Sequence, residues 1–255
     1  MLEVCDLAVG YGHGAVVRGV SLRVDPHRVV ALVGPNGAGK TTLARCVAGY
    51  LRPASGRVQV RRGDTVRVLT GRRPWEVARA GVVYVPESGH IFPSLTVADN
   101  LGAALSSFPR PVARAHLPAA WETFPALAPL RRQPAGTLSG GEARLLGIAR
   151  AVLFARALAA TGAGGAPVLL LDEPSSGLSP VALERVAETL RALARDGWSM
   201  LLVEQMAPFA LALADAACVM ARGEVVAAGP PEAIRADERV RRSWLGGAAP
   251  DGGGR

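Results

Sequence analysis

The sequence predicts an α/β fold in which a mainly parallel sheet carries a phosphate-binding loop, and three observations support this. Residues 29–33 form a β-branched apolar run, which a glycine-rich turn and a helical pattern follow. Residues 168–171 are a second continuous apolar run, typical of a central strand covered on both faces. Residues 2–24 and 56–70 alternate apolar and polar side chains, which predicts an antiparallel layer beside the parallel sheet.

The composition is that of a folded globular protein. Of the 255 residues, 49% are hydrophobic and 20% are charged, which excludes a wholly disordered chain. The apolar stretch at residues 206–214 is far shorter than the roughly 18 to 20 residues that span a bilayer. Cys5, Cys46 and Cys218 have neither a metal-ligand spacing nor a disulfide framework, and the N-terminus lacks a signal-peptide pattern. We therefore expect a cytoplasmic protein with reduced thiols and no transmembrane segment.

Positive charge is concentrated in the first part of the chain. Residues 1–160 have 20 basic and 9 acidic residues, whereas residues 161–255 have 9 basic and 12 acidic residues. Such a basic region could bind nucleic acid or an anionic membrane surface. However, 28 of the 29 basic residues are arginine, and aromatic residues do not alternate with them as a base-stacking platform requires. Ordinary surface charge is therefore the favoured interpretation.

The only lysine, Lys40, lies in the turn after the first apolar run. Residues 34–41 (GPNGAGKT) have the spacing of a phosphate-binding loop. Its glycines let backbone N–H groups surround an anion, and the N-terminus of the following helix adds partial positive charge. Lys40 then reaches the β- and γ-phosphates as a compact charge, and the Thr41 hydroxyl is the expected Mg²⁺ ligand. The predicted nucleotide-binding residues here are Gly34, Pro35, Asn36, Gly37, Ala38, Gly39, Lys40, Thr41 and Thr42.

Two acidic residues end the second apolar run. We expect Asp172 to hold magnesium through its hydration shell. Glu173 would lie beside the γ-phosphate, where its carboxylate can orient the attacking water and accept its proton. An ordinary solvated turn before Pro174 is the alternative, which the phosphate-binding loop upstream makes less favoured.

A third motif, LSGGE at residues 138–142, precedes apolar side chains at helical spacing. Ser139 and Glu142 form the sequence pattern of a capping box, so we expect the helix to start at Ser139. That cap does not account for Gly140 and Gly141. Their backbone N–H groups at a positive helix end predict a second phosphate-binding site.

With these motifs, the chain resembles the ATP-binding subunits of ABC transporters from about residue 2 to about residue 245. The four matching segments are the Walker A loop (34–41), the signature (138–142), Walker B (168–173) and the D-loop (175–180). The resemblance implies a P-loop NTPase core with an antiparallel β layer and a small helical lobe, and ATP and Mg²⁺ as cofactors. It also implies a head-to-tail dimer in which Ser139, Gly140 and Gly141 close over the partner's ATP. Tyr11 resembles the aromatic residue that stacks on adenine, with packing at a strand edge as the alternative.

Two departures narrow the resemblance. Glu87 occupies a position where most family members have glutamine, and Gln205 one where most have histidine. Both exchanges resemble the ATPases of branched-chain amino acid importers. They imply Glu87 as an oxygen ligand near Mg²⁺ and Gln205 as a group that donates a hydrogen bond to the γ-phosphate in catalysis. Arg144 replaces a glutamine usual after the signature, and we expect it to affect contacts across the dimer.

The resemblance also organises the chain. We expect one ATPase domain, residues 1–246, with a core at 1–93 and 146–246, a helical lobe at 94–145 and a disordered glycine-rich tail at 247–255. In the lobe, helical patterns are expected at 97–105 and 112–124. Residues 156–167 are longer than the family's usual link and are expected to be a flexible surface insertion.

The sequence therefore predicts the ATP-hydrolysing subunit of an ABC importer for branched-chain or other neutral amino acids. Its expected partners are a second ATPase subunit, identical or related, integral membrane permease subunits and, indirectly, a substrate-binding protein, at the inner face of the cell membrane. A urea or amide importer ATPase is one alternative. A non-transport ABC ATPase acting on nucleic acid is another, although such proteins usually have two cassettes or a long inserted arm. A nucleotide switch that barely hydrolyses ATP is a third.

The glutamine at position 205 makes a prediction about pH. An amide does not titrate near neutrality, so the wild-type protein should show no histidine-like transition near pH ~6.5 that arises from this position. Gln205→His should introduce one in the pH dependence of ATP hydrolysis. An identical inflection in the two rate profiles would contradict the assignment.

Overall fold

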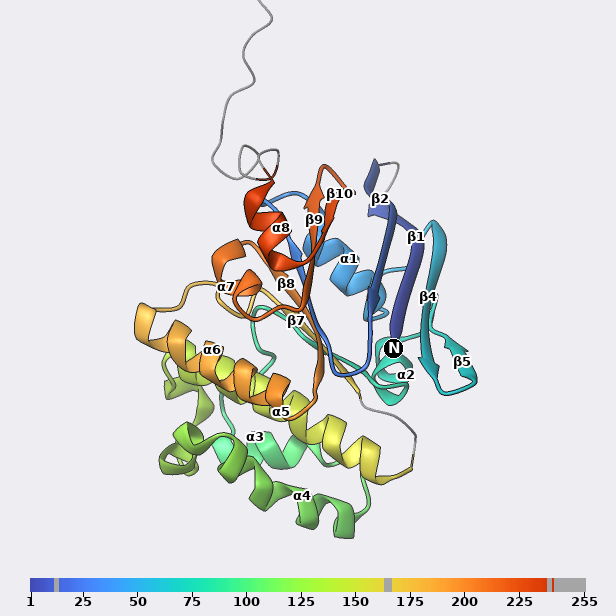
Figure 1. The fold of residues 1–255 in the computed structure, drawn as a ribbon. Coiled ribbons are helices and arrows are strands. Elements are labelled where there is room, and N and C mark those ends of the chain that lie inside the picture. The colour runs from blue at the N-terminus through green and yellow to red at the C-terminus, as the bar shows by residue number, and fades with distance from the viewer. Residues whose placement is uncertain (12–13, 163–166, 238–239, 241–255) are drawn as a thin grey trace, which may run out of the picture.

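The computed structural model describes residues 1–11, 14–162, 167–237 and 240. In this part of the chain, two sheets lie beside each other, and helices cover the larger one and form a lobe at one end (Figure 1). The predicted α/β fold with an antiparallel layer is confirmed.

The smaller sheet is antiparallel, in the strand order β2-β1-β4-β5. Its strands are β1 (Leu2–Tyr11), β2 (Gly14–Val24), β4 (Ser55–Arg62) and β5 (Thr65–Val68). These are the segments in which the sequence alternates between apolar and polar side chains. One face of this sheet, with Leu2, Val4 and Leu7 of β1, is buried against the rest of the molecule.

The larger sheet has the strand order β10-β9-β3-β8-β7-β6. Its strands are β3 (Val29–Val33), β6 (Val82–Val85), β7 (Val168–Asp172), β8 (Ser199–Glu204), β9 (Ala216–Ala221) and β10 (Glu224–Gly229). All neighbours pair in parallel except β10, which pairs antiparallel with β9 at one edge.

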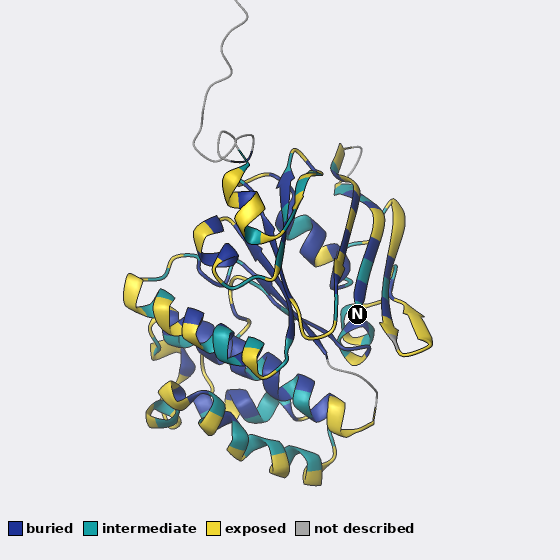
Figure 2. Cartoon of the chain, viewed as in Figure 1, coloured by how far each residue is buried: buried dark blue, intermediate teal, exposed yellow. Residues whose placement is uncertain are grey.

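Both faces of the larger sheet are buried (Figure 2). Leu169 and Leu171 of β7 pack in a core with the long helices, whereas Leu170 packs in a second core between the two sheets. Because successive side chains of a strand point to opposite faces, each residue of β7 meets one core or the other. This explains the unbroken apolar run in the sequence.

Helix α1 (Lys40–Val47) lies between the two sheets (Figure 1). It contacts β1 and β2 of the smaller sheet and β7 and β8 of the larger one. Leu43 and Val47 anchor it in the core between them. The N-terminus of α1 is therefore held at the carboxyl edge of the larger sheet.

The other helices are α2 (Pro74–Arg79), α3 (Val97–Ala104), α4 (Arg110–Thr123), α5 (Gly140–Ala160), α6 (Pro180–Arg195), α7 (Ala207–Leu211) and α8 (Pro231–Ala236), with 3₁₀ turns at Pro125–Leu130 and Ala135–Thr137. Helices α3, α4 and α5 contact one another and form the lobe at the bottom of Figure 1. The predicted capping box starts α5: the Glu142 carboxylate accepts a hydrogen bond from the backbone N–H of Ser139 at 2.8 Å, and the Ser139 hydroxyl accepts one from Glu142 N–H at 3.4 Å.

One sequence prediction is partly wrong. Residues 156–167 do not form a flexible insertion throughout, because α5 continues to Ala160, and Ala157 and Leu158 are buried. These residues extend the apolar face of the helix, so it ends only at the turn where Gly162 has a φ of 72°. Residues 163–166 lie outside the described residues.

The predicted division into a core and a helical lobe stays a prediction, and α5 crosses its boundary at residue 145 as one continuous helix. The tail predicted at 247–255 lies outside the described residues. Within the described ranges, no helix combines the length and the hydropathy that a bilayer crossing requires.

The contact between α5 and α6 makes a prediction about stability. A Cβ atom at Gly141 would lie 2.5 Å from the Cβ of Ala182, whereas a Cβ at Gly140 would have its nearest such neighbour at 3.9 Å. Gly141→Ala should therefore lower the free energy of unfolding by roughly 1–3 kcal/mol through overpacking. Gly140→Ala is the matched control and should unfold near the wild-type temperature. Equal melting temperatures for the two variants would show that Gly141 is not packed tightly against Ala182.

Candidate nucleotide-binding and catalytic site

The phosphate-binding loop connects β3 to α1, and its glycines are required by its geometry. A Cβ at Gly34 would lie 2.1 Å from the carbonyl oxygen of Met220 on β9. Gly37 and Gly39 have φ values of 78° and 100°, in the left-handed region that favours glycine. Gly39 is the N-cap of α1, so the loop ends directly at the positive end of that helix.

The structure brings Lys40 and Glu173 together. The Lys40 side chain is only 4% exposed, and its Nζ donates a hydrogen bond to the carbonyl oxygen of Pro35 at 3.2 Å. The same Nζ lies 3.7 Å from Oε1 of Glu173, whose side chain is 17% exposed. A buried lysine needs such partners, because an unpaired charge in the interior is costly. The predicted phosphate-binding cation thus neighbours the predicted base.

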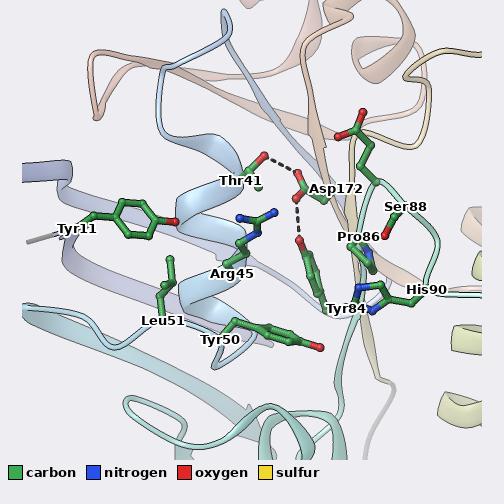
Figure 3. A pocket seen from close by; sticks show the side chains of 11 residues that line it. Tyr11, Thr41, Arg45, Tyr50, Leu51, Tyr84, Pro86, Ser88, His90 and Asp172 are labelled. Atoms are coloured by element: carbon green, nitrogen blue, oxygen red, sulfur yellow. Dashed lines mark hydrogen bonds between the residues drawn. The ribbon is translucent and has the colours of Figure 1, made fainter.

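The two predicted magnesium ligands Thr41 and Asp172 also meet (Figure 3). The Thr41 hydroxyl donates a hydrogen bond to Oδ1 of Asp172 at 3.2 Å, and the Tyr84 hydroxyl donates one to Oδ2 at 2.8 Å. Burial raises the pKa of Asp172, and these two hydrogen bonds partly offset that rise. Burial and the charge of Asp172 in turn raise the pKa of Tyr84, so its phenol stays protonated and remains the donor.

A cavity of about 480 Å³ opens beside this pair of oxygen ligands. Tyr11 and Glu87 line it together with Thr41 and Asp172, so the predicted adenine-stacking residue and the third predicted ligand lie in the same cavity. Tyr11 is half-exposed, and Glu87 accepts a hydrogen bond from the Ser176 hydroxyl at 2.8 Å. Side chains from the smaller sheet, α1 and the segment after β6 thus surround one space (Figure 3).

A second cavity, of about 430 Å³, contains the predicted catalytic groups Glu173 and Gln205. Gln205 is exposed and follows the last residue of β8, while Glu173 follows the last residue of β7. Because β7 and β8 are parallel neighbours, their carboxyl ends place both residues at the same edge of the sheet.

The signature residues lie apart from both cavities. Ser139 and Gly140 are exposed at the N-terminus of α5, and neither they nor Gly141 line the two cavities. Gly141 is buried against α6, which gives it a packing role that the sequence did not reveal. Within one chain, the structure therefore does not bring the two predicted phosphate sites together.

Sequence reasoning missed three residues, Glu204, Tyr84 and Arg45, and did not predict where the side chain of a fourth, Arg144, lies. Glu204 ends β8, is 1% exposed and accepts hydrogen bonds from both the backbone N–H and the hydroxyl of Ser175, and burial raises its pKa. Tyr84 and Arg45 point into the larger cavity beside Asp172 (Figure 3). Arg144, which we expect to affect contacts across the dimer, is buried in its own chain, and its effect on the dimer stays a prediction. Of the three missed residues, only Glu204 had a signal in the sequence, an acid at the end of an apolar strand like Asp172.

The side chains present fit a magnesium ion bound with a nucleotide. The described residues contain no group of three or more His, Cys, Asp or Glu side chains that could hold a metal by themselves. Nucleotide-bound Mg²⁺ does not need one, because one or two carboxylates, phosphate oxygens and waters complete its octahedron. Thr41 and Asp172 supply hard oxygen donors that already face each other.

Comparison with known proteins agrees with this geometry. A family model described as "ABC transporter" matches residues 17–176, and one described as "Branched-chain amino acid ATP-binding cassette transporter" matches residues 224–250. The high-affinity branched-chain amino acid transport ATP-binding protein BraG of Pseudomonas aeruginosa is 34% identical over 97% of this chain and 100% of its own. The lipopolysaccharide export system ATP-binding protein LptB of Escherichia coli is 32% identical over 96% of this chain and 97% of its own.

Among solved structures, the ADP conformation of MJ1267, an ATP-binding cassette of an ABC transporter, matches with a TM-score of 0.78 at 23% identity. It covers 96% of this chain and 98% of its own. The first family model spans more than half of the chain, and both relatives align over nearly all of it. The chain therefore belongs to the ABC transporter family, as an ATP-binding and ATP-hydrolysing subunit.

Proposed function

We propose that this subunit binds Mg-ATP at a head-to-tail dimer interface and drives the uptake of branched-chain or other neutral amino acids. The observation that carries the proposal is the meeting of Lys40 with Glu173 and of Thr41 with Asp172 at one edge of the sheet. These are the four groups that hydrolysis of a nucleoside triphosphate requires: a phosphate-binding cation, a base and two oxygen ligands.

The chemistry follows from these positions. Backbone N–H groups of the loop and the N-terminus of α1 hold the phosphates, and Lys40 neutralises charge on the terminal phosphoryl group. Glu173 orients a water and accepts its proton as the water oxygen bonds to the γ-phosphorus and the bond to the ADP oxygen breaks. Gln205, in the same cavity as Glu173, donates an amide hydrogen bond to the γ-phosphate.

The predicted magnesium ligands are Thr41 and Asp172, with Glu87 in the same cavity. When bound, the cation would offset the phosphate charge that builds up during transfer. Tyr84 positions the Asp172 carboxylate for this role by donating to its second oxygen. Tyr11, which is half-exposed and lines the cavity, is the proposed stacking partner of adenine.

The isolated signature supports the dimer. Ser139, Gly140 and Gly141 present a helix N-terminus that is away from the nucleotide cavity of their own chain. A second subunit, identical or related, in a head-to-tail arrangement would place each of these helix ends over the ATP of the other. Integral membrane permease subunits are the proposed membrane partners, and a substrate-binding protein acts through them, which places the ATPase at the inner face of the membrane.

The solute class is supported by the matched C-terminal model and by the name of BraG. The similarity to LptB favours a second candidate, an export ATPase. Uptake of radiolabelled leucine and of radiolabelled urea by a deletion strain, together with the state of its envelope lipids, distinguishes the amino acid importer from a urea importer and from an exporter. We expect loss of leucine uptake, restored by the wild-type gene and not by Glu173→Gln. Unchanged leucine uptake together with an envelope lipid defect, or loss of urea uptake alone, would refute the amino acid assignment.

Glu173→Gln should separate binding from hydrolysis. The amide keeps the size of the side chain but cannot accept the proton of water, so turnover should fall roughly 10²- to 10⁴-fold. ATP binding should persist, and an ATP-dependent dimer should accumulate in light scattering. Wild-type rates of phosphate release in this variant would show that Glu173 is not the base.

Tyr84→Phe should weaken magnesium binding. Loss of the hydroxyl leaves Oδ2 of the buried Asp172 without this donor, so we expect the Mg²⁺ concentration for half-maximal ATP hydrolysis to rise roughly tenfold. Tyr50→Phe is the matched control, because the Tyr50 ring packs 5.6 Å from that of Tyr84 and lines the same cavity. Equal magnesium dependence in both variants would contradict the role of Tyr84.

A further inference from the structure

Arg144 lies in α5, five residues after the Ser139 cap, and its side chain is turned into the molecule. Only 8% of the residue is exposed. One guanidinium nitrogen donates a hydrogen bond to the carbonyl oxygen of Glu173 at 3.0 Å, and the other donates to that of Ser176 at 3.3 Å. Arg144 therefore bridges the two ends of the turn that follows β7.

This turn contains an unfavourable backbone conformation. Glu173 has a φ of 47°, in the left-handed region that residues other than glycine rarely adopt. Its N–H donates to Val203 on β8 at 2.8 Å, and its carbonyl accepts from the backbone N–H of Ser176 at 3.1 Å. Arg144 adds a charged donor to that same carbonyl. Such a conformation persists only where the surroundings hold it, and here it sets the direction of the Glu173 side chain.

The guanidinium also lies among the acids of the site. Burial lowers the pKa of Arg144, and the charges of Glu87, Glu204, Glu173 and Asp172 oppose that effect. Ser176, whose carbonyl oxygen accepts a hydrogen bond from Arg144, donates a hydrogen bond from its hydroxyl to Glu87. The arginine is thus at once a donor to the turn and a counter-charge for the carboxylates around it.

The residue type suits this position. A guanidinium has donors in a planar fork, which can reach two carbonyl oxygens while its charge offsets the neighbouring acids. A glutamine is shorter, has both of its donor hydrogens on one nitrogen and has no charge, so it cannot offset the neighbouring acids as the guanidinium does. The departure at position 144 therefore has a consequence inside the chain, at the catalytic turn.

We propose that Arg144 is a positioning residue for ATP hydrolysis: it holds the Glu173–Ser176 turn on helix α5, so that the Glu173 carboxylate stays aimed at the terminal phosphate. The inference rests on the proposed function of Glu173 as the base. Because α5 begins at the signature, Arg144 also ties the position of Ser139–Gly141 to the base of its own chain. A shift of the helix tip against the partner's nucleotide would then reach Glu173.

A double-mutant cycle tests this. Arg144→Gln, Glu173→Gln and the double variant are compared in single-turnover hydrolysis of labelled ATP and in steady-state kinetics. Arg144→Gln should lower kcat roughly 10- to 100-fold through misplacement of the base, with KM for ATP within about threefold of wild type. If Arg144 acts through Glu173, the double variant should be no slower than Glu173→Gln alone. Arg144→Lys, which keeps the charge but not the fork, should recover part of the rate.

Arg191→Gln is the control for loss of an arginine, because Arg191 pairs with Glu184 on the exposed side of α6. Wild-type kcat in Arg144→Gln, or losses that multiply in the double variant, would overturn the proposal. So would a loss confined to KM. If Arg144→Gln does not fold, as thermal unfolding would show, Arg144→Lys takes its place in the cycle with the same criteria. Failure of the proposed function is distinct, since wild type itself would then hydrolyse no faster than Glu173→Gln.

Discussion

Four carboxylates lie near one another where the parallel strands of the larger sheet end, and the burial of two of them, Asp172 and Glu204, is the constraint on which the site depends. Asp172 and Glu204 are almost fully buried, and burial raises the pKa of each. Glu87 raises the pKa of Asp172 further, and Glu173 raises that of Glu204. A buried carboxylate such as Asp172 or Glu204 is stable as an anion only where hydrogen-bond donors or cations surround it.

The fold supplies a different partner to each acid. Hydroxyl groups donate to three of them: Thr41 and Tyr84 to Asp172, Ser175 to Glu204, and Ser176 to Glu87. The fourth, Glu173, has Lys40 at 3.7 Å. Neutral donors fix geometry at lower desolvation cost than buried ion pairs. The cation Lys40 therefore lies where a bound triphosphate would add still more negative charge.

Much of this arrangement follows from local sequence. The phosphate-binding loop, the strand ending in Asp172 and the capping box at Ser139 each combine a periodic pattern with a turn or cap, and such local signals fix an element and its end. The meeting of Thr41 with Asp172 could be predicted as well, because parallel strands end at a common edge. The prediction of a flexible insertion at residues 156–167 is wrong up to Ala160, where α5 continues. It relied on composition, and alanine can extend a buried helix face as readily as it fills a loop.

The contacts of Arg144 and Tyr84 could not be predicted in this way. Each depends on the direction of one side chain across a tertiary contact, from α5 to the turn after β7 and from β6 to the end of β7. Nothing in the residues beside them distinguishes a buried donor from a surface one. Gly141 is similar, because its need for a bare Cα comes from Ala182 on another helix.

The contact between Arg144 and the Glu173 turn bears on why the proposed ATPase has two subunits. Helix α5 presents its N-terminus to the outside, and three residues beyond Gly141 it holds, through Arg144, the turn that bears Glu173. In a head-to-tail dimer, α5 would therefore contact the nucleotide bound by the partner subunit at its N-terminus and the Glu173 turn of its own subunit through Arg144. Gly141 and Arg144 are three residues apart in one packed helix, so a displacement of the helix tip is expected to reach Arg144. In such a dimer the two sites would be coupled, because the same few residues of α5 would belong to both.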